Sequence, residues 1–367
     1  MSEEIKKAPL IRLSKREAMD PKKIWAIRVG SIVLALILGC IPILITSNNP
    51  ILAYGAIIKG SLGTSFYLKQ TLRESIPLLG CALAIAPCFK MRFWNIGAEG
   101  QITAGAIAAS YFAINFATKL PHIPLLIIMF VAAAIVGGMW AMIPGFFKAR
   151  YNTNETLFTL MMNYIAIGIV AWLQGGPWEG RKGTQQIPLF NKNAYLPTVL
   201  GLHMGWIIVL LLVFLVYIYM KYTKQGYEIA VIGDSLNTAR YAGMNVGWII
   251  VRTMLVSGAI CGIVGFILVS GQNKTITSNV AGGVGFTAIT VAWLGQLNAF
   301  AMIVISLILS ILSRGSSYLQ QEMGVPAAIS EIVSGILLFC MLGCEFFINY
   351  RMIIRKKSKK GEEGIDA

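Results

Sequence analysis

Residues 125–147 read LLIIMFVAAAIVGGMWAMIPGFF, an unbroken run of apolar and small residues with no charged side chain. Uncharged runs longer than about 18 residues are typical of helices that cross a lipid bilayer, because about 20 helical residues span its hydrocarbon core. Residues 29–45 and 254–269 form uncharged runs that are only slightly shorter. The sequence therefore predicts a protein that crosses a membrane several times.

The composition supports this class. Hydrophobic residues make up 56% of the chain and charged residues only 13%, against about 25% charged residues in soluble domains. Helices are expected for the spans because the backbone must satisfy its own hydrogen bonds in lipid. The alternating pattern of membrane barrel strands is absent from the apolar runs. The predicted fold class is an all-α polytopic membrane protein.

About ten spans are expected along the chain. Their approximate ranges are 29–45, 76–89, 102–116, 125–147, 156–173, 206–220, 254–269, 282–295, 299–312 and 332–344. Residues 1–28 form a basic arm, 29–348 the membrane domain and 349–367 a basic tail. Lys and Arg beside spans mark the cytoplasmic side, so both termini are expected on the cytoplasmic side of the plasma membrane.

The net charge of +15 invites comparison with nucleic-acid-binding proteins. The basic residues, however, gather at the two chain ends and in short connections between the apolar runs. Contact with anionic lipid accounts for basic segments placed in this way. We therefore expect membrane lipid, and no nucleic acid, as the partner of these charges.

The residues that would indicate an enzyme are missing from the sequence. The six cysteines lie in apolar stretches without a CxxC pair, and the two histidines flank loops, so no metal site is predicted. The Walker pattern for phosphate binding does not occur. The chain is predicted to be no enzyme and to hold no cofactor. If it transports a solute, the energy comes from a separate ATPase or from ion coupling.

Two glycine-interrupted segments, 95–100 and 282–295, lie between apolar spans in the two halves of the chain. Broken helices at corresponding positions of two repeats often form the substrate path of a transporter. The sequence therefore predicts two pseudo-repeat halves. Substrate-pathway candidates are the polar residues Asn95, Glu99 and Gln101 in the first segment and Phe286 in the second.

Glu99 has two interpretations, because a carboxylate between apolar spans is either functional or structural. It can accept hydrogen bonds from sugar hydroxyls, or it can cap the free amides of a broken helix. Thr159 and Asn163 lie one helical turn apart and join the candidates. They either line a polar path or bond across helices. Phe286 either stacks on a base or sits at the membrane interface.

Residues 221–252 form the longest polar stretch placed on the cytoplasmic side. Two short helices are expected there, broken at Gly226 and Gly233. The pair Asp234-Ser235 suits the cap of the second helix, and Gly243 its stop. The stretch is either a plug for the groove of a partner protein or an ordinary connector.

Three motifs carry a family resemblance: WNIGAEGQ at 94–101, NETLFTLMMNYI at 154–165, and Gly233 with ARYAG at 239–243, followed by SGA at 257–259 and GFTAI at 285–289. Over roughly residues 72–347 the chain resembles permeases of bacterial ATP-binding-cassette importers for branched-chain amino acids, ribose and nucleosides. The match is closest to the nucleoside branch, which works with basic-membrane-protein lipoproteins.

The resemblance implies that the chain imports nucleosides. Two alternatives stay open: a permease for ribose or another simple sugar, and an ion-coupled secondary carrier. It implies two ABC ATPase subunits, a second permease that is identical or homologous, and an extracellular substrate-binding lipoprotein as partners. It also places the ATPase coupling helix within 221–252. The coupling residues are Gly233, Asp234, Ala239, Arg240, Tyr241 and Gly243.

The sequence departs from the family pattern at three positions. Ala230 stands where an Arg is usual, Asp234 where an Asn is usual, and Thr156 where a β-branched apolar residue is usual. The first two lie in the coupling stretch. The resemblance therefore implies the class of partner more strongly than each individual contact with it.

Overall fold

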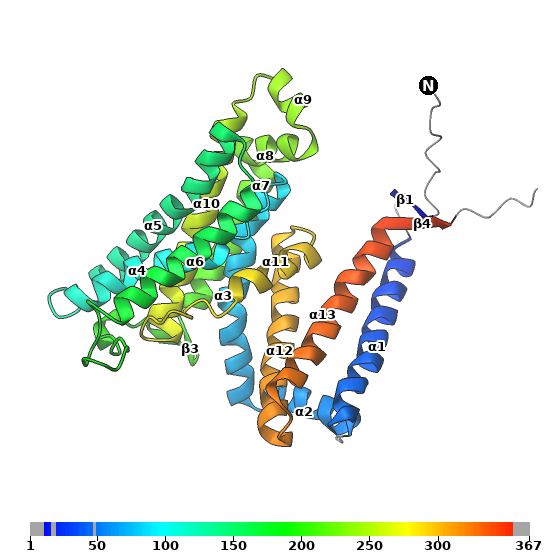
Figure 1. Cartoon of the computed structure of the whole chain (residues 1–367), viewed down its shortest axis with the longest axis horizontal. Helices are drawn as coiled ribbons and strands as arrows, with labels where there is room; N and C mark the ends of the chain where they lie inside the picture. Colours follow the sequence, from blue (N-terminus) through cyan, green and yellow to red (C-terminus); the bar gives the residue numbers. More distant parts are fainter. Residues whose placement is uncertain (1–10, 16–19, 47–48, 355–367) are drawn as a thin grey trace, which may run out of the picture. The chain divides into compact units, whose positions relative to one another are not determined.

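The computed structural model describes residues 11–15, 20–46 and 49–354, and it is almost entirely helical (Figure 1). The helices are α1 Pro21–Ile45, α2 Pro50–Leu62, α3 Ser65–Lys90, α4 Ala98–Phe116, α5 His122–Tyr151, α6 Glu155–Gln174, α7 Gly205–Tyr222, α8 Lys224–Asp234, α9 Leu236–Tyr241, α10 Val246–Ile267, α11 Val284–Leu294, α12 Ala299–Met323 and α13 Ala327–Asn349. The shorter elements are the strands β1 Ile11–Lys15, β2 Thr198–Val199, β3 Leu202–His203 and β4 Tyr350–Ile354, the 3₁₀ turn η1 Lys192–Ala194 and the π-helical turn η2 Leu268–Gln272.

The chain divides into two compact units. Unit 1 joins Met1–Ala53 to Met323–Ala367, and unit 2 is Tyr54–Glu322. In unit 1, α1 packs against α13, and β1 pairs antiparallel with β4. The outer parts of the predicted basic arm and tail, residues 1–10, 16–19 and 355–367, lie outside the described residues.

In unit 2, α10 is the central helix and packs against α3, α4 and α5. Glycines allow this close approach. A Cβ at Gly262 would collide with the backbone oxygen of Ala133 on α5, and one at Gly105 on α4 would collide with Gly262. Small residues at such contacts let helix backbones meet in a membrane, where packing must hold helices together.

The expected second span is longer than predicted. The residues between the first two expected spans, 29–45 and 76–89, contain α2 and the first turns of α3. The side chain of Thr64 caps α3 by accepting the backbone N–H of Tyr67 at 3.2 Å. The first turns of α3 contain polar residues, so they do not form an apolar run and were not predicted as part of a span. Further along, α3 continues through Pro77 and Pro87.

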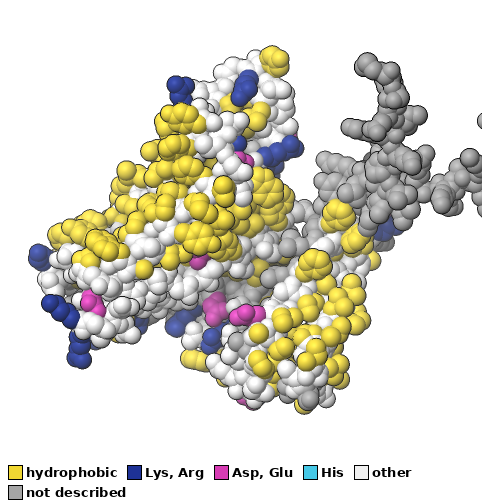
Figure 2. Space-filling view, viewed as in Figure 1, with side chains coloured by type: hydrophobic (Ala, Val, Ile, Leu, Met, Phe, Trp, Pro, Cys, Tyr) yellow, Lys and Arg dark blue, Asp and Glu magenta, His cyan; other side chains and the backbone are white. Residues whose placement is uncertain are grey.

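The apolar outer surface agrees with a membrane protein. On α5 the side chains of Ile127, Val131, Ile135 and Met139 are exposed along one face. In unit 2, Figure 2 shows hydrophobic side chains over the middle, and Lys and Arg toward the ends. Six helices of the described residues are long and apolar enough to cross a membrane, or seven with α1 and α2 as one bent span. The predicted number of about ten spans is therefore not confirmed.

Candidate functional site

The segment 91–97 joins the end of α3 to the start of α4 and forms the centre of the predicted site. It turns sharply at Arg92, whose backbone φ is 59°. The backbone N–H of Phe93 donates to Cys88 O at 2.9 Å and closes this turn. The segment then passes Trp94 and Asn95 before α4 begins at Ala98. The WNIGAEGQ motif thus spans a break between two helices, as the glycine-interrupted pattern indicated.

Asn95 is fully buried and binds three groups around this break. Its Oδ1 accepts hydrogen bonds from the backbone N–H of Gly97 and from Nε2 of Gln101, both at 3.0 Å. Its Nδ2 donates to Oγ of Ser257 on α10 at 3.3 Å. Asn95 therefore joins the segment before α4 to the central helix of unit 2.

Glu99 joins the starts of two helices that are far apart in the sequence. It lies in the first turn of α4 and is 5% exposed. Its Oε1 accepts the backbone N–H of Gly283 at 2.7 Å, and its Oε2 accepts that of Gly285 at 2.8 Å. Free amides at a helix start carry partial positive charge and favour a carboxylate. Of the two interpretations from sequence, the geometry displays the capping arrangement, and the helix it caps is α11.

Thr159 and Asn163 bring α6 to the same break. Oγ1 of Thr159 accepts the backbone N–H of Ile96 at 3.3 Å. Oδ1 of Asn163 accepts the N–H of Gly100 at 2.8 Å, and its Nδ2 donates to Ile96 O at 3.0 Å. Both side chains are buried and both bond across helices. We call Asn95, Glu99, Gln101, Thr159, Asn163 and Ser257 the break network.

Phe286 stands apart from this network. It lies on α11 and its side chain is 45% exposed. A different aromatic group gathers beside the break: Phe89, Trp94 and Trp293 have ring centroids 5.6–5.7 Å apart, and the two tryptophans stack. Sequence reasoning missed Trp293, and it quoted Ser257 only as part of a motif. A lone Ser or Trp in an apolar run carries no local signal for such contacts.

The predicted coupling stretch folds as two short helices, α8 and α9, which lie together beyond the ends of α7 and α10 in Figure 1. The cap of the second helix is confirmed, because Oγ of Ser235 accepts the N–H of Thr238 at 3.2 Å. Gly243 follows with a φ of 73°, which ends the helix. The expected break at Gly233 is one residue off, since α8 continues to Asp234. The expected break at Gly226 is wrong, because Gly226 lies in the first turn of α8, where its N–H donates to the cap Thr223.

The outward face of α9 is open while its inner face is buried. The side chain of Tyr241 is 93% exposed, and Asp234 and Arg240 are exposed as well. Ala239 is fully buried beneath them. Behind α9, α8 is held to α10 by an ion pair between Arg252 Nη2 and Glu228 Oε2 at 2.9 Å. The stretch therefore presents an exposed surface above a buried apolar side chain.

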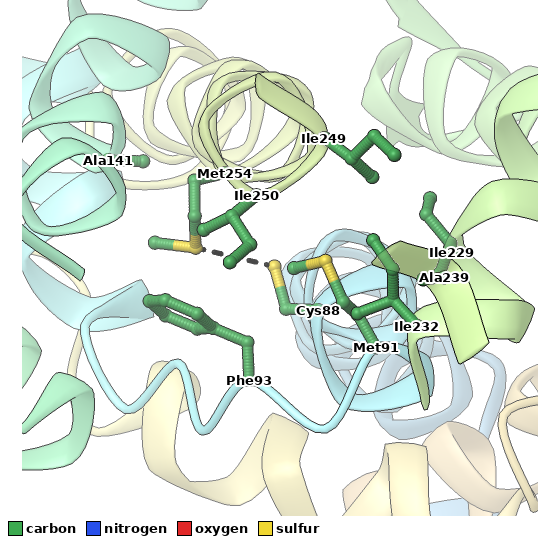
Figure 3. Close-up of a cluster of buried hydrophobic side chains, with 10 residues drawn as sticks. All are labelled: Cys88, Met91, Phe93, Ala141, Ile229, Ile232, Ala239, Ile249, Ile250 and Met254. Atoms are coloured by element: carbon green, nitrogen blue, oxygen red, sulfur yellow. Dashed lines mark hydrogen bonds between the residues drawn. The ribbon is translucent and has the colours of Figure 1, made fainter. Parts of the chain in front are cut away.

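A cluster of buried apolar side chains links α8 and α9 to the start of the break segment (Figure 3). We call it the coupling core. In Figure 3, Met91 from the segment lies beside Ile232 from α8, whereas Phe93 lies on the opposite side of the cluster. Cys88 Sγ lies 3.6 Å from Met254 Sδ. Its members are Cys88, Met91, Phe93, Ala141, Ile229, Ile232, Ala239, Ile249, Ile250 and Met254. In addition, a Cβ at Gly233 would collide with the backbone oxygen of Lys90.

Among the described residues, no group of three or more His, Cys, Asp or Glu side chains is placed to hold a metal ion. The break network contains one carboxylate, amides and hydroxyls, all of which make the hydrogen bonds given above. Its chemistry is therefore that of positioning and of polar recognition.

Comparison with known proteins identifies the chain's relatives. Residues 67–342 match the family described as branched-chain amino acid transport system permease component. A glucose ABC transporter permease of Haloferax volcanii is 30% identical over 97% of both chains. A guanosine ABC transporter permease of Bacillus subtilis is 30% identical over 90% of this chain and 96% of its own. A nucleoside ABC transporter permease of Lactococcus lactis is 27% identical over 91% and 94%. No solved structure matches.

Proposed function

The chain belongs to the family of branched-chain amino acid transport system permease components, and on that basis we propose that it is the membrane-spanning permease of an ATP-driven importer of nucleosides. Such a permease is a multi-pass protein of the inner membrane and is not itself an enzyme. The choice of nucleosides as the substrate rests on the similarity to two nucleoside permeases, each of which matches at least nine tenths of this chain.

A simple sugar is the second candidate substrate. The glucose permease of Haloferax volcanii is as similar to this chain as the guanosine permease and covers more of it. Both solute classes are neutral and rich in hydroxyl groups. The proposal favours nucleosides because the nucleoside-type motif WNIGAEGQ is complete at residues 94–101.

Permeases of this family work with an ATPase and a substrate-binding protein. We infer two ATPase subunits, a second permease copy or homologue, and an extracellular lipoprotein that delivers the solute. The exposed surface of α9 around Arg240 and Tyr241 supports docking of an ATPase there. This assignment puts α8 and α9 in the cytoplasm, and the basic arm and tail on the same side.

The contacts of unit 2 support a route from the ATPase to the membrane. Movement of α9 would displace Ala239 and the coupling core, and with it Met91 and Phe93. These residues precede the break network, in which Asn95 and Glu99 hold the starts of α4 and α11. We propose that the network carries the movement to helices beside the solute path, with Gln101, Thr159, Asn163 and Phe286 along that path.

Uptake of labelled guanosine, uridine, ribose and glucose tests the proposal in cells with and without this chain. Loss of guanosine and uridine uptake on deletion is expected. The loss should follow ATP depletion and should not be reproduced by a protonophore while ATP stays high. A protonophore that abolishes uptake at high ATP would instead identify an ion-coupled carrier. Loss of glucose or ribose uptake alone would replace nucleosides by sugars.

A further inference from the structure

A polar cavity of ≈ 320 Å³ lies in unit 2 between α3, η2, the segment 273–283, α11 and α12. Pockets for small molecules occupy about 300–1,000 Å³, so this one suits a small solute. Glu74 on its wall lies sixteen positions before Lys90, where α8 packs, which at 1.5 Å per residue is about 24 Å. The cavity is therefore distant from the ATPase-docking surface.

The lining of this cavity carries hydrogen-bonding groups and one charged carboxylate. Gln272, Asn273 and Asn279 provide amides, Ser310 and Ser313 provide hydroxyls, and Glu74 provides the carboxylate. Oε1 of Glu74 pairs with Nη1 of Arg314 at 3.5 Å, which compensates its charge. A phosphate group placed here would face the carboxylate and be repelled. The lining thus suits a neutral solute rich in hydroxyl and amide groups.

Ser310 gives an independent sign that this cavity binds a ligand. Its side chain is 2% exposed, and its Oγ has no hydrogen-bond partner among the described residues. A buried hydroxyl without a partner costs about 1–3 kcal/mol, so such groups are usually satisfied by water or a ligand. The neighbouring Ser306 on α12, by contrast, donates to Ile303 O at 2.9 Å.

The break network shapes one wall of the same cavity. Gly282 and Val284 line it, and Gly282 and Gly283 have φ values of 58° and 80°, which turn the backbone into α11. The carboxylate of Glu99 stabilises this turn by accepting hydrogen bonds from the backbone N–H groups of Gly283 and Gly285. Glu99 is then a positioning residue for the cavity, and it does not need to touch the solute.

We propose that this cavity is a nucleoside-binding site within the permease, with the ribose hydroxyls on Glu74 and Ser310 and the amides of Gln272 and Asn273 on the base. The proposal rests on the proposed function, because it names a binding site for that function's substrate. Carboxylates accept strong hydrogen bonds from hydroxyls, and amides match the donor and acceptor edges of a base.

Protection of a cysteine at the rim tests the site on the full chain in membrane vesicles. Asn279 is exposed at the rim, so Asn279→Cys should react with a hydrophilic maleimide. Millimolar inosine or uridine should slow this reaction. 2′,3′-Dideoxyinosine should slow it about tenfold less effectively, because it lacks the hydroxyls that bind the charged Glu74. Inosine monophosphate should also protect less, because the Glu74 carboxylate repels its phosphate. The unsubstituted chain reports the background from its own cysteines.

Second substitutions in the Asn279→Cys background locate the effect. Glu74→Gln and Ser310→Val should weaken protection by inosine about tenfold, on the same arithmetic. Ser306→Ala, on the same helix but already bonded to the backbone, should leave protection unchanged. Absence of protection by both nucleosides would overturn the site. Uptake is measured separately, so the two proposals can fail independently. If nucleosides are imported but do not protect the cysteine, the binding site in this cavity is disproved. If no nucleoside is imported, the proposed function itself is disproved.

Discussion

The carboxylate oxygen Oε2 of Glu99 lies 2.8 Å from the backbone nitrogen of Gly285, although the two residues are 186 positions apart in the chain. Together with the bond to Gly283, this contact makes the side chain at the start of α4 the cap of α11. A Cβ on Gly285 would lie 2.7 Å from the same carboxylate oxygen, so glycine is needed for the approach. The two glycine-interrupted segments of the sequence are therefore one site in space.

Removal of the Glu99 carboxylate should weaken both the fold and transport. Glu99→Ala leaves the amides of Gly283 and Gly285 without their charged acceptor, which costs about 1.5–3 kcal/mol. Glu99→Gln keeps the shape but offers only one acceptor for two donors. We expect the apparent melting temperature in detergent to be highest for the wild type, lower for Glu99→Gln and lowest for Glu99→Ala. Both variants should insert into the membrane normally but show reduced uptake. Normal uptake in Glu99→Gln would contradict this role.

The contact between α8 and the end of α3 predicts an uncoupled variant. A side chain at Gly233 collides with the backbone oxygen of Lys90, so Gly233→Ala must push α8 away from α3. We expect assembly with the ATPase to persist while substrate-stimulated ATP hydrolysis and uptake fall together. Gly247→Ala is the matched control, because its nearest neighbours would be at 3.6 Å or more. Equal uptake in the two variants would refute the coupling role of this contact.

The exposed tyrosine of α9 predicts a change in binding without a change in folding. Tyr241 is 93% exposed, so Tyr241→Ala removes little from the isolated chain. Buried aromatic anchors of an interface are often worth about 2 kcal/mol or more, which corresponds to roughly thirtyfold weaker binding. We expect co-purification with the ATPase to fall while the melting temperature of the permease stays the same. Undiminished co-purification would place the docking surface elsewhere.

The class of protein could be predicted from sequence because long uncharged runs such as 125–147 allow few other structures. The same runs located α4, α5, α6, α7 and α11 within four residues at both ends, whereas α1, α10 and α12 extend eight or more residues beyond their predicted ranges at one end. Helix α3 was predicted too short because Lys69, Arg73 and Glu74 interrupt its apolar character. These polar residues are stabilised by distant groups: Arg73 Nη2 donates to Gly201 O at 2.9 Å, and Glu74 pairs with Arg314. The sequence around Arg73 and Glu74 contains no pattern that predicts such distant partners.

The members of the candidate site could be selected from sequence, but their partners could not. Asn95, Glu99 and Asn163 were chosen because polar groups between apolar spans are costly. Which backbone amide each one binds depends on how α4, α6 and α11 pack, and this is set by small residues spread over several helices. The polar cavity went unnoticed for the same reason, since Glu74 and Ser310 come from two segments that look ordinary in isolation.

His203 predicts how the stability of the chain depends on pH. It lies on β3, outside the spanning helices, is 3% exposed, and neither ring nitrogen has a hydrogen-bond partner among the described residues. Burial, together with the nearby positive charge of Arg73, lowers the pKa of His203 to about 4 from an ordinary value of 6.5. The folded chain therefore keeps this imidazole neutral over a range in which the unfolded chain protonates it.

The sign of the effect follows from proton uptake. As the pH falls from 6.5 toward 4, the unfolded state binds the proton first, so folding stability decreases by up to about 3 kcal/mol and then levels off below pH 4. Melting curves in detergent between pH 7.5 and 4.5 measure this loss. His203→Leu should have a flatter profile than the wild type because it binds no proton at this position. If His203→Leu and wild type lose stability in parallel, other groups control the pH response, and the neutral buried imidazole has no part in it.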